Sequence, residues 1–207
     1  MKKKITEIAD VQLGYQFRKK IEPVDDGSNR VIQIRNFDEN HALLKENLSR
    51  VRLDTAAEKY LISKGDVLFL SRGHRNWAAP IDDDLSATVA ASHFFVVRPK
   101  QDNVLSEYLA WYINQAPAQE YLHNIARRGT HMPLIPLSAF LGLTVDLPNI
   151  ETQRKIVELS RLMEHEKLLL SYLQEKRAQL INAICLKAAK DKKEKYYDLE
   201  SVSGRNQ

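Results

Sequence analysis

The sequence predicts an α+β protein, in which an irregular, mostly antiparallel sheet with small helices precedes a long C-terminal coiled-coil-type helix. Upstream of Pro148, short β-branched and apolar runs alternate with turn-forming residues. Downstream, apolar residues recur every three or four positions over about forty residues, which is the spacing of a helix seam. The composition, 43% hydrophobic and 28% charged, is that of a folded domain with a core.

Four segments of the first part have the pattern of strands. Residues 31–35 alternate, contain β-branched side chains and end in turn formers. Residues 67–70 form a run apolar enough for a buried strand. Residues 93–97 form another run, which stops before a proline, and residues 143–147 predict one more strand.

Helical spacing appears twice. Between residues 106 and 125 the apolar positions lie on one helical face, which is interrupted near Pro117. The second helix is expected from Ile150 to Ala189, with Asn149 as its N-cap, and would be about 60 Å long. The residues of its expected seam are Ile156, Leu159, Met163, Leu170, Leu173, Leu180 and Ile184. Glu166 and Arg177 interrupt the seam, and such residues specify either antiparallel pairing or a low-affinity dimer.

These patterns divide the chain into a domain at residues 1–149, a helix at 150–189 and a polar tail at 190–207. The lysine-rich tail is expected to be disordered. No run of about 18 apolar residues could span a membrane, and no apolar region follows the basic N-terminus as it would in a signal peptide. A single cysteine, Cys185, excludes an internal disulfide, so the expected compartment is the cytoplasm.

Motifs of catalysis are absent from the sequence. No glycine-rich phosphate loop follows a strand, no Cys/His spacing suits a metal, and no serine occupies a nucleophile elbow. The acidic run Asp82-Asp83-Asp84 leaves open a metal-dependent nuclease, although adjacent carboxylates in a turn are usually just solvated. We therefore expect no catalytic residue, no bound metal and no cofactor.

Two polar, basic loops are the candidate binding elements. Arginine makes bidentate contacts to guanine and asparagine to adenine, and basic side chains also hold phosphates. The net charge of +4 is modest, with 19 basic and 18 acidic residues up to Asn149, so composition alone leaves ordinary solubilising loops as an equal alternative. The candidate DNA-binding residues are Arg35 at the end of the first strand, Arg72, His74, Arg75 and Asn76 in one loop, and Arg127, Arg128, Thr130 and His131 in the other.

An ordered set of segments resembles one half of a Type I restriction–modification specificity subunit. The matching segments are residues 31–35, 64–73, 108–113, Arg128-Gly129-Thr130 with 137–143, and Leu147-Pro148 with Gln153 and Ile156. The resemblance covers about Ile5 to Ala189. The chain departs from the family at the helix entrance, where Asn149 replaces a second proline and Thr152 stands where the family has glutamate. It carries one recognition domain and one helix where the family usually has two of each.

The resemblance implies a subunit that does no chemistry. Such subunits bind double-stranded DNA and position a separate methyltransferase, which takes an adenine out of the base stack, together with a restriction subunit. A single recognition domain implies self-association through the helix and an interrupted palindromic site. A pure interaction protein, which occupies the methyltransferase or specificity-subunit surface without reading DNA, is the alternative.

Overall fold

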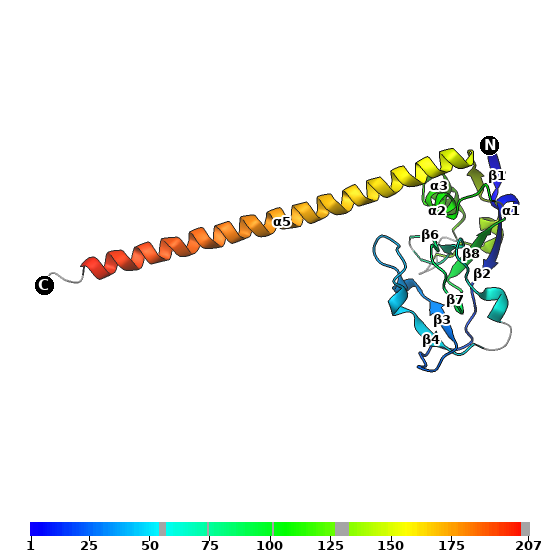
Figure 1. The fold of residues 1–207 in the computed structure, drawn as a ribbon, viewed down its shortest axis with the longest axis horizontal. Coiled ribbons are helices and arrows are strands. Elements are labelled where there is room, and N and C mark those ends of the chain that lie inside the picture. The colour runs from blue at the N-terminus through cyan, green and yellow to red at the C-terminus, as the bar shows by residue number, and fades with distance from the viewer. Residues whose placement is uncertain (54–56, 74, 101, 127–132, 204–207) are drawn as a thin grey trace. The chain divides into compact units, whose positions relative to one another are not determined.

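The computed structural model describes residues 1–53, 57–73, 75–100, 102–126 and 133–203, and a four-stranded sheet forms in the part of the chain before residue 100 (Figure 1). Its order is β2 (Ala9–Leu13), β8 (Phe94–Pro99), β5 (Val67–Leu70) and β6 (Ala78–Pro80), and every pair is antiparallel. A second sheet has the order β4 (Ser49–Val51), β3 (Asn29–Ile32) and β7 (Thr88–Ala90), in which β3 and β7 are parallel. β1 (Lys2–Lys4) pairs with β9 (Thr144–Asp146) in antiparallel.

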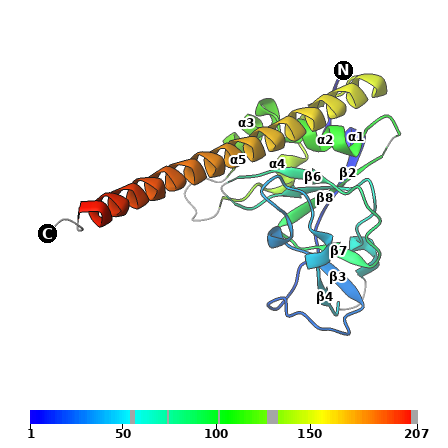
Figure 2. The same ribbon diagram turned by 60° about the vertical axis from the view of Figure 1, so that its left-hand side comes forward.

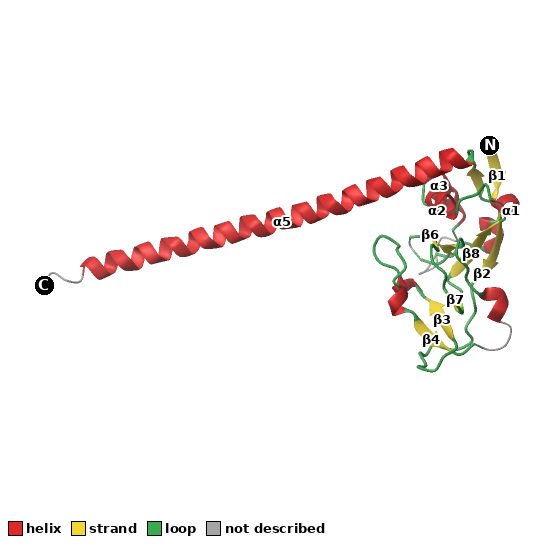
Figure 3. Cartoon of the chain, viewed as in Figure 1, coloured by secondary structure: helices red, strands yellow, loops and turns green. Residues whose placement is uncertain are grey.

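The helices are short except for the last (Figure 3). They are α1 (Ile5–Ile8), α2 (Ser106–Ile113), α3 (Ala116–Ile125), α4 (Leu137–Phe140) and α5 (Ile150–Ser203), and three 3-10 turns occupy Ile34–Asn36, Lys45–Asn47 and Ala57–Tyr60. The chain divides into two compact units, Met1–Glu158 and Leu159–Gln207. The fold is therefore the predicted α+β class with a long C-terminal helix, and the first turns of α5 belong to the first unit.

The apolar runs of β5 and β8 are explained by cores on both faces of the four-stranded sheet. Val67 and Phe69 belong to a core that also contains side chains of α2, α3 and α4. Leu68 and Leu70 belong to a second core, which contains Trp77. Because successive side chains of a strand point to opposite faces, a strand covered on both faces has no polar position, and its sequence reads as one continuous apolar run.

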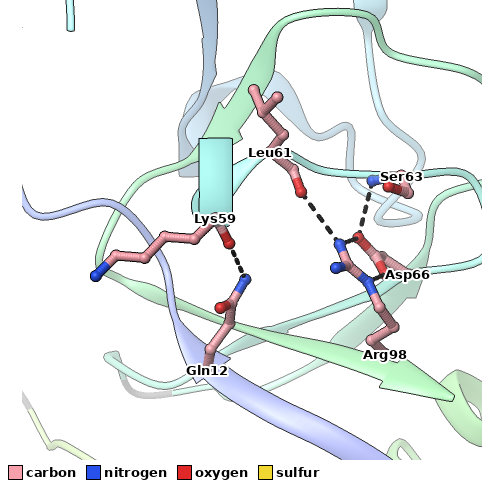
Figure 4. A network of polar contacts seen from close by, with 6 residues as sticks. All are labelled: Gln12, Lys59, Leu61, Ser63, Asp66 and Arg98. Carbon is pink, nitrogen blue, oxygen red and sulfur yellow. Dashed lines mark hydrogen bonds and ion pairs between the residues drawn. The ribbon is translucent and has the colours of Figure 1, made fainter. Parts of the chain in front are cut away.

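One buried carboxylate fixes the loop before β5 (Figure 4). Asp66 is 1% exposed and accepts hydrogen bonds from Arg98 Nε at 2.7 Å, Arg98 Nη2 at 2.8 Å and the Ser63 amide at 2.8 Å. Arg98 Nη2 also donates to the Leu61 carbonyl. These bonds hold the segment of residues 61–66 against β8, since a buried carboxylate is stable only when it is paired and hydrogen-bonded.

The entrance of α5 is held by a buried glutamine. Gln153 is fully buried; its Oε1 accepts from the Leu105 amide at 3.0 Å, and its Nε2 donates to the carbonyls of Asn103 and Pro148. Asn149 caps the helix as predicted, because its Oδ1 accepts from the Thr152 amide at 2.9 Å. The helix therefore starts at a fixed place on the first unit.

The structure differs from the sequence prediction at two element ends. The first predicted strand, 31–35, is β3 at Asn29–Ile32, and Arg35 lies in the following 3-10 turn. The tail predicted to be disordered from residue 190 is helical as far as Ser203. The residues after Ala189 are rich in lysine and glutamate, which favour helix, and no glycine or proline occurs between Ile150 and Ser203.

Candidate nucleic-acid interface

The first predicted basic loop joins β5 to β6 and is held against the segment that follows the second basic loop. The Ser71 carbonyl accepts from the Ile135 amide at 2.9 Å, and the Gly73 amide donates to the Pro133 carbonyl at 3.0 Å. Arg72 and Leu134 form an antiparallel bridge between these two bonds. Gly73 has φ +130°, a backbone conformation that favours glycine. The structure thus brings together residues 71–73 and residues 133–135.

Two arginines of this loop are exposed, and three of the described residues beside them, Ser71, Gly73 and Asn76, form hydrogen bonds. The loop is closed by the Asn76 amide, whose Nδ2 donates to the Leu70 carbonyl at 2.8 Å. At its start, the Ser71 amide and hydroxyl both donate to the His93 carbonyl at 2.9 Å. Arg72 and Arg75 are exposed. Arg72 thus lies between two hydrogen-bonded residues, Ser71 and Gly73, and Arg75 directly precedes the hydrogen-bonded Asn76. Such fixed neighbours suit a surface that recognises an anion.

His93 is a functional candidate that the sequence did not reveal. It directly precedes β8, and its carbonyl is the acceptor for Ser71. Burial, and then the positive charge of Arg72, lower the pKa of the His93 imidazole from its ordinary value. His93 lies close to Arg72 because β5 pairs with β8, and no local sequence pattern predicts that pairing.

A third loop, residues 37–43, packs beside the first. Phe37 and Leu43 form an antiparallel bridge, and His41 has φ 63°. The His41 ring stacks on Trp77 with ring centroids 4.4 Å apart and an interplanar angle of 14°. Burial lowers the pKa of His41, and the nearby charge of Asp38 acts in the opposite direction. Residues 133–135 thus contact the start of the first basic loop, and residues 37–43 contact Trp77 at its end. The sequence had indicated only turn-forming residues after residue 35.

The remaining predicted DNA-binding residues are placed differently. Arg35 is exposed and donates from Nη2 to Ser49 Oγ at 3.1 Å, so it is tied to β4 and not to the first basic loop. Asn76 is half-buried and its amide serves to close the loop. The predicted residues that lie outside the described part of the chain are His74, Arg127, Arg128, Thr130 and His131.

The acidic turn has other partners. Asp83 forms an ion pair with Lys45, and Asp82 also has an interaction partner. Within the described residues, no group of three or more His, Cys, Asp or Glu side chains could hold a metal ion. None of the helices in the described ranges is long and apolar enough to cross a membrane.

The predicted seam splits between the two units. Ile156 is partly buried and packs against the core of the first unit, unlike the rest of the predicted seam. The physical reason is that α5 begins on the first unit, where Val157 is also buried. The other six seam residues, Leu159, Met163, Leu170, Leu173, Leu180 and Ile184, are each 52–70% exposed.

Sequence comparison places this arrangement in a known family. Residues 1–180 match the model of the Type I restriction modification DNA specificity domain. The chain belongs to this family. The Type I restriction enzyme HindI specificity subunit of Haemophilus influenzae is 31% identical over 124 residues, which are 58% of this chain and 27% of that protein.

Solved structures support the same fold. The specificity domain resembles the HsdS subunit from Thermoanaerobacter tengcongensis with a TM-score of 0.60 and 18% identity over 82% of this chain. It resembles the S subunit from M. genitalium with a TM-score of 0.53 and 15% identity over 80% of this chain. The matches cover 43% and 39% of those chains, so this chain, with one target-recognition domain and one C-terminal helix, spans less than half the length of either structure.

Proposed function

We propose that this specificity domain reads a DNA sequence for a Type I restriction–modification system. In this role it places a separate adenine methyltransferase subunit, and a restriction subunit, on the DNA. The observation that carries the proposal is the pair of exposed arginines, Arg72 and Arg75, which lie beside Ser71, Gly73 and Asn76. Ser71 and Gly73 are hydrogen-bonded to residues 133–135, and Asn76 is hydrogen-bonded to Leu70. Family membership supports the choice of DNA as the ligand.

Because the charges of the domain nearly cancel, DNA binding depends on where individual arginines lie. Up to Asn149 the chain has 19 basic and 18 acidic residues, so attraction to DNA cannot come from an overall positive field. It must come from local groups that contact phosphates and bases. Arginine suits both tasks, since its planar fork binds a phosphate or the O6 and N7 atoms of guanine in bidentate fashion.

The second part of the proposal is that two copies act together. One recognition domain contacts one half-site, whereas a two-fold dimer presents two identical domains to two inverted half-sites. The exposed apolar side chains between Leu159 and Ile184 supply the surface for that association. The distance between the recognition domains then fixes the gap between the half-sites.

Binding measurements with arginine variants test the DNA-reading role. The assay includes a methyltransferase subunit. If Arg72 or Arg75 reads a base, we expect its replacement by alanine to reduce the free energy of DNA binding by about 1–3 kcal/mol and to relax specificity at one base pair. An arginine that holds a phosphate would instead weaken all sequences alike and lower the salt slope by about one. Arg50→Ala on β4, also an exposed arginine of this unit, is the matched control.

The competing role is that of an interaction protein that covers a partner surface without reading DNA. In that case the arginine variants would bind specific and random duplexes as the unaltered chain does, and a random-sequence selection would enrich nothing. The proposal also predicts that the chain alone neither methylates DNA nor cleaves it with Mg²⁺. Cleavage that survives purification and disappears in Asp82→Ala would instead support the nuclease alternative.

A further inference from the structure

Two opposite charges interrupt the apolar stripe of the second unit. The stripe advances by alternating steps of three and four residues from Leu159 to Ile184, and Glu166 and Arg177 occupy two of its positions. Both side chains are exposed. Within the described residues, no hydrogen bond or ion pair of the helix involves either of them. A helix partner would therefore have to meet one acid and one base in an otherwise apolar seam.

The stripe is symmetric about the midpoint between Ser171 and Tyr172. Leu170 and Leu173 are equally far from that midpoint, and so are Glu166 and Arg177. The outer pairs follow the same rule, Met163 with Leu180 and Leu159 with Ile184. Two antiparallel helices related by a two-fold axis at this midpoint bring each residue to the axial level of its equidistant counterpart. Apolar residues then meet only apolar residues, and each charge meets the opposite charge.

We propose that the second unit pairs in antiparallel with a second copy of itself in this register, so that Glu166 of each copy faces Arg177 of the other. This inference rests on the proposed self-association and adds its direction and register. The two charged layers select the register, since an ion pair in a seam costs less than a charge packed against hydrocarbon. The apolar layers supply the attraction through the surface that they bury.

Other arrangements of the same two helices place the charges badly. A parallel, in-register pair sets Glu166 against Glu166 and Arg177 against Arg177, which is repulsive in both layers. When one helix of the antiparallel pair is shifted along the other by one heptad, Glu166 faces Leu170 of the other copy. A shift by one heptad in the opposite direction makes it face Ile184. Both offsets leave the acid and the base opposite apolar side chains.

The distance between the Cys185 residues of the two copies reports the register. Cys185 is exposed and can carry a spin label in the unaltered protein. In the proposed register it lies level with Glu158 of the other copy, which gives a label separation of about 40 Å at 1.5 Å per residue. The heptad offsets give about 30 Å and about 50 Å, and a parallel in-register pair gives less than about 20 Å.

Charge reversal tests the facing pair independently. We expect Glu166→Arg or Arg177→Glu to weaken dimerisation by about 100-fold, because each change converts two attractive layers into repulsive ones. The double variant restores both layers and should recover the original affinity. Glu164→Arg, which lies off the stripe, is the matched control. Circular dichroism of each variant verifies that the fold is retained.

The experiment uses the full chain, alone and with a methyltransferase subunit. A separation near 40 Å together with recovery in the double variant supports the register. A dimer with another separation, or single variants that dimerise normally, overturns the register while leaving self-association intact. A strict monomer under both conditions overturns self-association itself, and the register with it.

Discussion

The two units of this chain differ in the exposure of their large apolar side chains. In the first unit Phe69, Phe95 and Phe140 are at most 2% exposed and pack on one another. In the second unit the large apolar side chains between Leu159 and Leu186 are 52–70% exposed. The first unit thus has a core of its own, whereas the second is a single helix whose large apolar side chains are exposed.

The two units are also stabilised by different kinds of contact. The first unit is closed by contacts between residues far apart in sequence, such as the pairing of β2 with β8 (Figure 2). The second unit is one helix whose internal bonds are local, and an isolated helix gains little stability without a packed face. The difference predicts that mutations in the two units have effects of different kinds.

The largest expected effect is on the core of the first unit. Phe140→Ala removes a fully buried ring that stacks on Phe69, and we expect a loss of about 3–5 kcal/mol in the free energy of unfolding. Leu173→Ala in the second unit is the contrasting change. It should alter the free energy of unfolding of the first unit by less than about 0.5 kcal/mol while weakening association. Urea unfolding at several protein concentrations separates the two effects, and equal losses would contradict the comparison.

The next effect concerns the point where the helix leaves the first unit. Gln153→Ala removes the hydrogen-bond partner of the half-buried Leu105 and of the Asn103 carbonyl, and we expect a loss of about 1–3 kcal/mol in the free energy of unfolding. Thr152→Ala changes an exposed neighbour and is the control. Hydrogen exchange of the Leu105 amide is the direct measurement. Unchanged protection of that amide in Gln153→Ala would mean that another group satisfies it.

The smallest expected effect is a pH dependence of the free energy of unfolding, which comes from His93 beside the first basic loop. The pKa of His93 is lowered by burial and then by Arg72, so protonation favours the unfolded chain. The stability from the neutral imidazole is present above pH 6.5 and is lost as the pH falls through that value toward the folded pKa. Arg72→Gln removes only the charge, so the pKa of His93 should rise but stay below 6.5. An NMR titration of the imidazole measures this, and an unchanged pKa would contradict the role of Arg72.

The sequence predicted the parts of the fold that local patterns encode. β5 and residues 94–97 of β8 are continuous apolar runs, and the N-cap at Asn149 precedes a long amphipathic pattern, so each was predicted. The strands β1, β2, β4, β6 and β7 were missed because they are short, and their residues acquire a strand role only from a distant partner.

The candidate site was predicted in part for the same reason. Arg72 and Arg75 were predicted because a basic loop follows an apolar strand, and their contact with DNA stays a prediction. His41 and His93 were not, since stacking on Trp77 and contact with Ser71 depend on chain segments more than twenty residues away. Arg35 was included for its charge, and its bond to Ser49 ties it instead to β4.

The most direct test of the account is to map the DNA methylated when this chain is expressed with a methyltransferase subunit. We expect adenine methylation at an interrupted palindrome, because two copies of one recognition domain must read the same half-site in opposite orientations. Arg72→Ala should relax one base pair symmetrically in both halves. Methylation at a site with two unrelated halves, or a pattern that is the same without this chain, would contradict the account.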